Sequence, residues 1–495
     1  MDPALYLAVD LGAGSGRVFL AGLADDELLL EEVRRFRYPP RMGGGHLRWD
    51  VSRMFDEIRA GLRAGGARAR ALGRPVASVG IDSWAVDYGL VDRAGELVED
   101  PVCYRDARTA GVMERVFAMI PREEVSARTG IQCLPFNTLY QLVAHQHAGV
   151  DPRAHRLLLI PDLLHFFLTR QPVAEYTNAT TTQMVDAQTG GWDLAMCEQL
   201  GVPVRLLPEI VPAGHEIGPM LPSIARALEL PDVHVIAPAT HDTGSAVAGT
   251  PLQDGWAYIS SGTWSLVGVE RTSPLMNADV TRSNFTNEGG AYGTTRFLKN
   301  VMGLWILESC REAWQSQDAG ADWAGLVGAA RALPDTPAVI DPDDPRLFSP
   351  PGMLDALKTQ LAETGQRCPD TPAAVARMVL DSLAFRYAEV LAELGRLTGE
   401  PIQGVQIVGG GSLNDHLNQA TADATGVPVV AGPVESTVIG NVVVQALGRG
   451  RFASLAAART HIAAHVPTKT FIPQPTARFA AAARRYADLV ARRTS

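Results

Sequence analysis

The first group of residues that could bind a ligand or take part in a reaction follows the first apolar run of the chain. The segment AVDLGAGSGR (residues 8–17) places Asp10 at the end of an expected strand, with a glycine-rich loop after it. Such a loop lets the main chain approach a charged ligand, and its successive N–H groups can cradle a phosphate. Asp10 could then hold a metal ion through water, while Ser15 and Arg17 contact phosphate oxygens. The loop glycines are Gly12, Gly14 and Gly16.

The same loop leaves two other interpretations open. Its letters fit D-x-G-x-G-x-G, the first motif of methyltransferases that bind S-adenosylmethionine. A tight β-hairpin that merely needs glycine would look alike, since a single glycine loop is weak evidence for any ligand. Other segments of the chain therefore have to decide between these ligands.

A second candidate is the carboxylate of Asp242 in THDTG, which follows an apolar strand. From there it could accept the proton of an attacking hydroxyl, the base role in phosphoryl transfer. Alternatively, Asp242 or Thr243 caps the helix that follows, and a cap can also hold a base in place. His241 taken alone would be an ordinary structural histidine.

Two further loops combine glycine with hydroxyl groups. In SSGTWS (residues 260–265), hydroxyls and amides on a hairpin turn would make a second phosphate clamp, unless this is a Ser-Gly turn without a ligand. In VGGGSLN (residues 408–414), three glycines between a strand and a helix would leave bare backbone on which a flat ligand such as adenine could lie. Alternatively, these glycines only allow the strand and the helix to pack tightly. In IDSWAVDYGLVD (residues 81–92), an acid and an indole would form a wall for a sugar, or else a core Trp and a surface acid.

The elements that must position these groups form an α/β pattern in two halves. A chain of 495 residues is too long for one core, so two domains are expected, at residues 1–247 and 248–495. Strand–glycine–loop units at residues 8–17, 258–265 and 405–412 suggest related halves that each contribute a loop. Residues 373–397 carry the periodicity of a long amphipathic helix. A helix at the C-terminus is expected to pack back onto the second domain.

Composition narrows the partners. The net charge is −10 and no basic stretch is long enough for a nucleic-acid track, so nucleic acid is not expected as a partner. The five cysteines lie far apart without a C-x-x-C, which argues against a disulfide framework and a zinc site. No apolar run of about 18 residues exists to span a membrane, and a cytoplasmic location is expected.

Taken in order, these segments resemble the FGGY carbohydrate kinases. Within that family, GIQCLPFNTLYQL and EYTNATTTQ are similar to the branch that acts on L-rhamnulose. The matching segments run from residue 8 to residue 437 and are AVDLGAGSGR, GIDSWAVDYGLVD, YRDART, GIQCLPFNTLYQL, EYTNATTTQMV, THDTGSAV, SSGTWSLVG, TNEGG, FLKNVMGLW, IVGGGSLN and AGPVEST.

The resemblance implies two actin-like domains of ribonuclease-H type with an ATP and sugar cleft between them. It implies transfer of the γ-phosphoryl of ATP to the 1-hydroxyl of L-rhamnulose, with Mg²⁺ and with Asp242 as proton acceptor. A monomer or homodimer is expected. Asp10 would hold the Mg²⁺, through water. The residues implied to contact the sugar are Ala85, His241, Asp242, Thr243 and Asn300. Those implied to contact ATP are Ala13, Gly14, Ser15, Gly16, Arg17, Thr263, Glu308 and Gly410.

Two positions depart from the family pattern. Ala85 stands where members often have Gly, so one methyl group would crowd a sugar that meets the main chain there. Glu308 replaces a nucleotide-side Gln, and an ionised carboxylate only accepts hydrogen bonds, which puts that contact in doubt. The alternatives are a related kinase for another ketose such as L-fuculose or L-xylulose, and a non-enzymatic actin-like ATP-binding protein. A methyltransferase would have no use for the three later loops.

Overall fold

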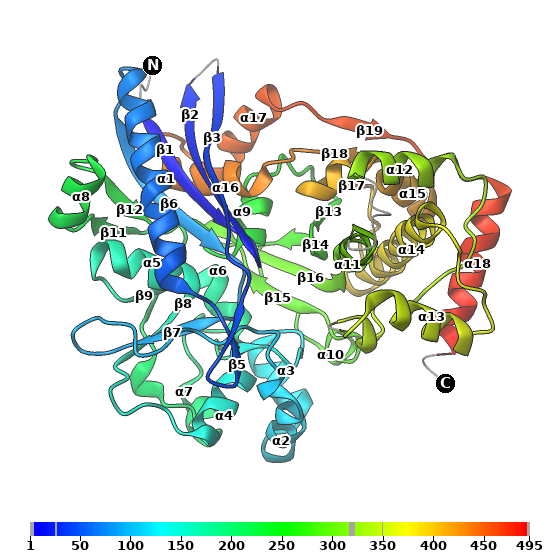
Figure 1. Cartoon of the computed structure of the whole chain (residues 1–495), viewed down its shortest axis with the longest axis horizontal. Coiled ribbons are helices and arrows are strands. Elements are labelled where there is room, and N and C mark those ends of the chain that lie inside the picture. The colour runs from blue at the N-terminus through cyan, green and yellow to red at the C-terminus, as the bar shows by residue number, and fades with distance from the viewer. Residues whose placement is uncertain (1–3, 25–26, 316–321, 349, 493–495) are drawn as a thin grey trace. The chain divides into compact units, whose positions relative to one another are not determined.

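The chain folds into two units whose elements are labelled in Figure 1. The structure is a computed structural model that describes residues 4–24, 27–315, 322–348 and 350–492. The first unit comprises the described residues of Met1–Pro251, Glu270–Phe297 and Ser436–Val466, and the second those of Leu252–Val269, Leu298–Glu435 and Pro467–Ser495. The division therefore differs from the expected single boundary after residue 247, because two later segments pack with the first unit.

A six-stranded sheet organises the first unit, in the order β11-β12-β6-β1-β2-β3. The expected opening strands form an antiparallel series, and β1 also pairs in parallel with β6. All seven residues of β1 are buried, as its continuous apolar pattern indicates. The bounds are β1 (Leu5–Leu11), β2 (Ser15–Ala24), β3 (Glu27–Arg37), β6 (Val76–Ser83), β11 (Glu216–Pro219) and β12 (His234–Ile236).

Helices cover both faces of this sheet. Side chains alternate along β1, so Tyr6 and Ala8 pack in one cluster with α16 (Ser436–Gly448), while Leu7 faces Gly65 of α1 (Val51–Ala71). The helix α16 is thus the reason that a late segment belongs to the first unit: its apolar face completes the core beside β1.

The rest of the first unit surrounds this sheet with short pairs of strands and helices. The strands are β4 (Arg41–Gly43), β5 (His46–Arg48), β7 (Tyr88–Val91), β8 (Arg156–Leu159), β9 (Val173–Glu175), β10 (Glu209–Val211) and β15 (Thr286–Gly289). The helices are α2 (Val112–Met119), α3 (Arg122–Thr129), α4 (Thr138–Ala148), α5 (Ile160–Thr169), α6 (Tyr176–Ala179), α7 (Leu194–Gln199), α8 (Pro222–Leu228), α9 (Asp242–Ala248), α10 (Ala278–Ser283) and α17 (Leu455–His465).

In the second unit, adjacent strands follow the order β16-β14-β13-β17-β18-β19. The long helix expected at residues 373–397 is confirmed as α14 (Pro372–Thr398), which begins after the capping hydroxyl of Thr371. The strands are β13 (Trp256–Ser261), β14 (Trp264–Arg271), β16 (Thr295–Met302), β17 (Gly404–Val408), β18 (Val429–Ala431) and β19 (Lys469–Phe471). The other helices are α11 (Trp305–Gln315), α12 (Trp323–Ala332), α13 (Met353–Glu363), α15 (Asp415–Thr425) and α18 (Ala477–Ala491).

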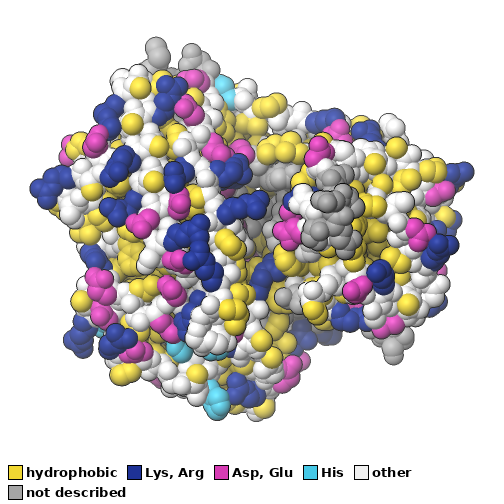
Figure 2. All heavy atoms as spheres, in the orientation of Figure 1, with side chains coloured by type: hydrophobic (Ala, Val, Ile, Leu, Met, Phe, Trp, Pro, Cys, Tyr) yellow, Lys and Arg dark blue, Asp and Glu magenta, His cyan; other side chains and the backbone are white. Residues whose placement is uncertain are grey.

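The surface carries mixed charges. On the face shown in Figure 2, basic and acidic side chains are interspersed over much of the described surface. Within the described residues, no helix is both long enough and apolar enough to cross a membrane.

Candidate active site

The carboxyl ends of β1 and β6 bring two acidic side chains into register. Asp10 on β1 pairs with Asp82 on β6, and Ser83 at the end of β6 bridges to His241. The main-chain amide of Ser83 donates to the carbonyl of Thr240 at 2.9 Å. Because three chain segments end at the same edge of the sheet, the first acid and the predicted base lie in one region of the first unit.

Asp10 is paired with Arg17 across the hairpin. The two residues face each other in the β1–β2 register, and Arg17 Nη2 lies 2.5 Å from Asp10 Oδ2. Only 7% of the Asp10 surface is exposed. Burying a carboxylate costs free energy unless the carboxylate is paired. Arg17 therefore neutralises the charge of Asp10 and also places a positive charge beside the loop.

The glycine loop is a hairpin turn with internal bracing. The hydroxyl of Tyr38 lies 2.6 Å from Gly12 O and 2.9 Å from Ser15 O, and its one proton is shared between these two carbonyls. The amides of Gly12 and Gly14 donate within the turn, to Ser15 O and Gly12 O. Ser15 itself is exposed. The hairpin interpretation is therefore correct as geometry, and the predicted phosphate contacts of residues 13–17 stay a prediction about what this turn presents.

One glycine of the turn has a packing role that the sequence pattern did not indicate. A Cβ on Gly16 would stand 2.5 Å from the ring of Phe36 and 2.7 Å from Leu11, whereas one on Gly14 would meet nothing within 4 Å. Gly16 is thus required by the close approach of β3 and β1, and Gly14 leaves open backbone.

Asp82 is a buried carboxyl that the site prediction left out. Its side chain is fully buried, and Oδ2 accepts a hydrogen bond of 2.5 Å from Asn441 Nδ2 on α16. Burial raises the pKa of Asp82 well above its usual range, and the charges of Asp10 and Asp242 add to that rise. Its position at the end of β6 was the available signal, since Asp10 ends the neighbouring strand.

Asp242 begins α9 and is held by its neighbour. Its Oδ1 accepts from the amide of Thr243 at 2.6 Å and from the Thr243 hydroxyl at 3.2 Å. His241 is the N-cap residue, so the expected cap at Asp242 or Thr243 is shifted by one position. The Asp242 side chain keeps 30% of its surface exposed. Burial of the rest raises the pKa of Asp242, with a further contribution from Asp10 and opposing ones from His241 and Thr243.

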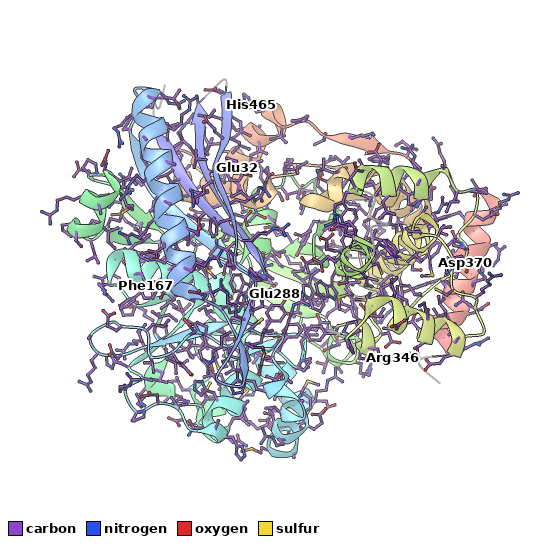
Figure 3. All side chains as sticks on the ribbon, in the orientation of Figure 1. Glu32, Phe167, Glu288, Arg346, Asp370 and His465 are labelled. Atoms are coloured by element: carbon purple, nitrogen blue, oxygen red, sulfur yellow. The ribbon has the colours of Figure 1, made fainter. Side chains whose placement is uncertain are left out.

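His241 lies between Asp242 and a buried ion pair. Its Nε2 is 3.4 Å from Asp242 Oδ1, and its Nδ1 is 3.3 Å from Glu288 Oε2. Arg296, which is fully buried, contacts both His241 Nδ1 and Glu288 Oε2 at 3.1 Å. Glu288 is labelled in Figure 3. Neither Glu288 nor Arg296 was singled out from sequence, although Glu288 lies in TNEGG, and together they fix the imidazole.

The strand end before His241 is anchored by Glu175. This buried carboxylate accepts from the amides of Thr177 and Thr240 at 2.9 Å each, and from both hydroxyls at 2.5 and 2.9 Å. The hydroxyl of Thr177 in turn accepts from the His241 amide at 3.2 Å. The EYTNATTTQ segment thus positions the start of α9 from a distance of more than sixty residues along the chain.

The segment expected to form a wall for the sugar contains a buried indole and buried acids. Trp84 is 6% exposed, and Asp87 is 1% exposed. Asp87 Oδ2 accepts from the indoles of Trp49 and Trp84 at 2.7 and 3.0 Å. Ala85, between them in sequence, is half-buried. The surface acid of the alternative interpretation is therefore wrong for Asp82 and Asp87.

In the second unit, two of the residues expected at the nucleotide, Thr263 and Gly410, belong to neighbouring loops. The β13–β14 turn contains Thr263, whose carbonyl accepts from Trp305 N at 3.2 Å at the start of α11. Gly411, next to Gly410, approaches Ser261 so closely that a Cβ there would overlap its hydroxyl oxygen. Thr263 and Gly410 are exposed. The expected ligand-binding segments of this unit are thus adjacent.

Glu308 and Asn300 have different surroundings. Both carboxylate oxygens of Glu308 are engaged by Arg311, at 2.9 and 2.6 Å. A nucleotide contact at Glu308 would have to share these oxygens with Arg311, and the contact stays a prediction. Asn300 is half-buried on β16.

Among the residues that the structure describes, no group of three or more His, Cys, Asp or Glu side chains could hold a metal ion. Mg²⁺ usually keeps several waters and binds through one or two carboxylates plus substrate phosphates. Asp10 fits that mode, in which the ion enters with a nucleotide.

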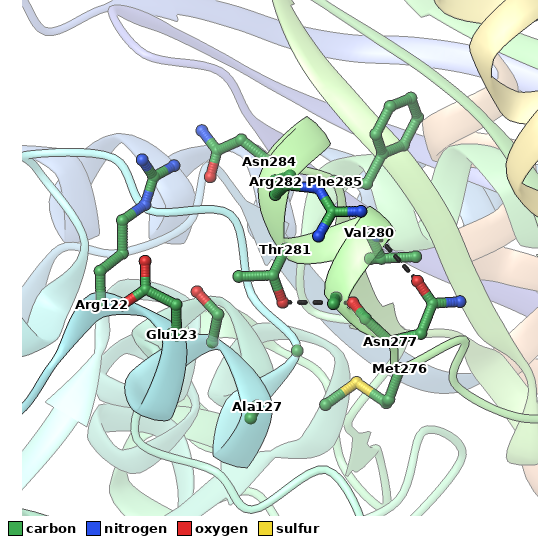
Figure 4. A pocket seen from close by; sticks show the side chains of 13 residues that line it. Arg122, Glu123, Ala127, Met276, Asn277, Val280, Thr281, Arg282, Asn284 and Phe285 are labelled. Carbon is green, nitrogen blue, oxygen red and sulfur yellow. Dashed lines mark hydrogen bonds between the residues drawn. The ribbon is translucent and has the colours of Figure 1, made fainter.

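A separate cavity lies between α3 and α10 of the first unit (Figure 4). It encloses about 600 Å³, and Glu123, Asn277, Thr281 and Asn284 are among its lining residues. None of the residues predicted to contact sugar or nucleotide lines it.

The chain is similar to known proteins over nearly its whole length. The chain matches the models of the FGGY family of carbohydrate kinases, N-terminal domain at residues 5–249 and C-terminal domain at residues 257–448. It is 44% identical over 488 residues to a rhamnulokinase of Pectobacterium carotovorum, covering 98% of this chain and 96% of that protein. It is 40% identical to a rhamnulokinase of Bacteroides thetaiotaomicron, covering 96% and 97%.

Solved structures show the same fold at low sequence identity. A ligand-bound xylulose kinase from Lactobacillus acidophilus has a TM-score of 0.79 at 15% identity, covering 99% of this chain and 98% of that one. Plasmodium falciparum glycerol kinase with ADP has a TM-score of 0.76 at 15% identity, covering 99% and 97%. The expected two-domain α/β kinase fold is confirmed.

Proposed function

The chain belongs to the FGGY family of carbohydrate kinases, and from this we propose that it transfers the γ-phosphoryl group of ATP to the 1-hydroxyl of L-rhamnulose. The product would be L-rhamnulose 1-phosphate. The choice of sugar is supported by the rhamnulokinases that align with nearly the whole chain. The observation that carries the chemistry is Asp242, a recessed carboxylate at the start of a helix with one oxygen already held.

Asp242 is proposed to orient and deprotonate the sugar hydroxyl. Thr243 occupies Oδ1, and within the described residues no hydrogen bond to Oδ2 is found, so this oxygen can accept the substrate proton. His241 Nε2 lies 3.4 Å from the same oxygen, Oδ1, and His241 is itself held by Glu288. Phosphoryl transfer needs little covalent help, so a base in a fixed position supplies much of what the protein must provide.

The nucleotide contacts remain those expected from the sequence. We propose that residues 13–17 contact the phosphates, that Thr263, Glu308 and Gly410 contact the nucleotide, and that Asn300 and Ala85 contact the sugar. Mg²⁺ bound with ATP would neutralise charge on the transferred phosphoryl group. Asp10 would hold a water of that ion, with Arg17 limiting the negative charge of the loop.

The kcat/KM for the sugar is expected to fall at a higher pH than it would with an ordinary aspartate as the base. The pKa of Asp242 is raised by burial and by Asp10 above its usual value of about 4. A base works only when deprotonated, so activity is lost as the pH falls through this raised pKa. A profile of kcat/KM, which reports the pKa values of the free enzyme, should show an acid limb above about pH 4, and that limb should vanish from the residual activity of Asp242→Asn. A profile that is flat down to pH 4 would contradict this.

The substrate is tested with a panel of ketoses in a coupled assay for ADP release. L-Rhamnulose is expected to give the highest kcat/KM, ahead of L-fuculose and L-xylulose. One methyl group in a pocket is worth only about 1–3 kcal/mol, so the ratios should be moderate. If another ketose is the best substrate, the proposal of L-rhamnulose is wrong, while the proposal of a sugar kinase stands. ATP binding without any sugar product would favour the non-enzymatic alternative.

Location and assembly are also proposals. The five cysteines are free, and four of them are buried, which supports a reducing cytoplasm. We retain the expectation of a monomer or homodimer.

A further inference from the structure

The segment between β6 and β7 contains a strained turn beside the proposed sugar wall. Val86 has a φ of 69°, in the left-handed region that β-branched residues rarely adopt. The amide of Asp87 donates to the carbonyl of Ala85 at 3.0 Å, two residues back. A positive φ at the middle residue together with this bond describes a γ-turn, a rare and strained conformation.

Such strain persists only where the surroundings enforce it. The carbonyl of Val86 accepts from the Thr138 hydroxyl at 2.7 Å and from Gln141 Nε2 at 3.2 Å. Both donors come from α4, and both side chains are fully buried. One face of α4 therefore holds the strained carbonyl.

The residue after the turn is held equally firmly. The Asp87 carboxylate accepts from Gln141 Nε2 at 3.1 Å through Oδ1, and from the amide of Tyr104 at 3.1 Å through Oδ2. The indoles of Trp49 and Trp84 donate to the same Oδ2. Gln141 thus contacts both the strained carbonyl and the acid that holds the two indoles, so the turn and the aromatic wall form one rigid group.

We propose that Thr138 and Gln141 are positioning residues for the sugar. They do so by holding the γ-turn at Val86 in place, a contact called the clamp below. The clamp sets the main chain of half-buried Ala85 and the ring of Trp84, at the same sheet edge as Asp242. The sugar role rests on the proposed function. The clamp itself is a property of the fold and can be measured without substrate.

The central variant is Thr138→Val, which keeps the shape of the side chain and removes the donor. Thr138→Ser restores the hydroxyl. The matched control is Thr421→Val on α15 of the second unit, because it removes a similar buried hydroxyl bond of 2.7 Å to a carbonyl, that of Leu417. Gln141→Met is the second variant, made in every case, and it also keeps the test available if Thr138→Val fails to fold.

The first measurement is amide hydrogen exchange of the peptide covering residues 84–88, without ligand. Thr138→Val is expected to speed exchange there. Without the Thr138 hydroxyl the turn at Val86 opens more often, and the hydrogen bond from the Asp87 amide to the Ala85 carbonyl then breaks. Thr138→Ser and Thr421→Val should match the wild type. Unchanged exchange in both Thr138→Val and Gln141→Met would overturn the clamp, whatever the enzyme phosphorylates.

The second measurement uses the ketose that the wild type phosphorylates best. Thr138→Val should raise the KM for that ketose about tenfold while kcat and the KM for ATP stay within about twofold, as for loss of one buried hydrogen bond. Faster exchange with an unchanged ketose KM would overturn the positioning role. If the wild type phosphorylates no ketose, the proposed function fails and, with it, the sugar role, while the exchange result still decides the clamp.

Discussion

Replacing Asp242 with asparagine is expected to lower kcat by about 10²–10⁴-fold, the range of a general base. Asparagine keeps the shape, and its amide oxygen can still accept from Thr243, so the start of α9 should not move. What is lost is the ability to take a proton. ATP binding should be nearly unchanged, because the proposed nucleotide contacts lie elsewhere in the chain. The measurements are kcat with the best ketose and the Kd for ATP.

The control for this variant is Asp415→Asn. Asp415 is also the first residue of a helix, α15, after the N-cap Asn414, so the helix-terminal charge is changed in the same way. Its carboxylate is paired with Lys469 at the surface, and its loss should leave kcat close to wild type. A near-wild-type rate in Asp242→Asn would remove Asp242 from the role of base.

Gly440→Ala is expected to destabilise the first unit by about 3 kcal/mol, at the upper end of the usual cost of overpacking. A Cβ at Gly440 would overlap the main-chain oxygen of Ser245 on α9 and stand 2.7 Å from the amide of Gly249. The neighbours are backbone atoms, which cannot rotate away as a side chain can. Urea unfolding measures the loss of free energy.

This variant should also reduce kcat, since the two helices in contact carry site residues. Helix α9 begins at Asp242, and α16 carries Asn441, the partner of Asp82. Gly328→Ala is the matched control: a Cβ there meets nothing within 4 Å, and alanine in an exposed helix should stabilise by up to about 1 kcal/mol. Equal unfolding free energies for Gly440→Ala and wild type would contradict the close crossing of α9 and α16.

Much of the local structure follows from patterns that are visible in the sequence. The apolar run before Asp10, the hairpin after it and the helix at residues 372–398 all form where periodicity and glycine predict them. These features depend on neighbours a few residues apart. The kinase family was also evident, because its segments occur in order along the chain.

The partners of the site residues could not be inferred in this way. Asn441 meets Asp82 across 359 positions, and Glu288 with Arg296 surrounds His241. Their identities follow from which helix covers which sheet face, and no local period encodes that. Burying a carboxyl without a partner is costly, which explains the distant donor of Asp82.

Residue types and their local spacing predicted the reactive groups: an acid after the first strand, an acid at the start of α9, and three glycine loops. The folded chain was needed to see that Asp82 joins these acids, that Asp87 holds two indoles inside the core, and that Thr138 holds Val86 in a strained turn. The physical reason is that burial, electrostatic coupling and strain depend on atoms brought together from distant segments, whereas residue type and spacing are local.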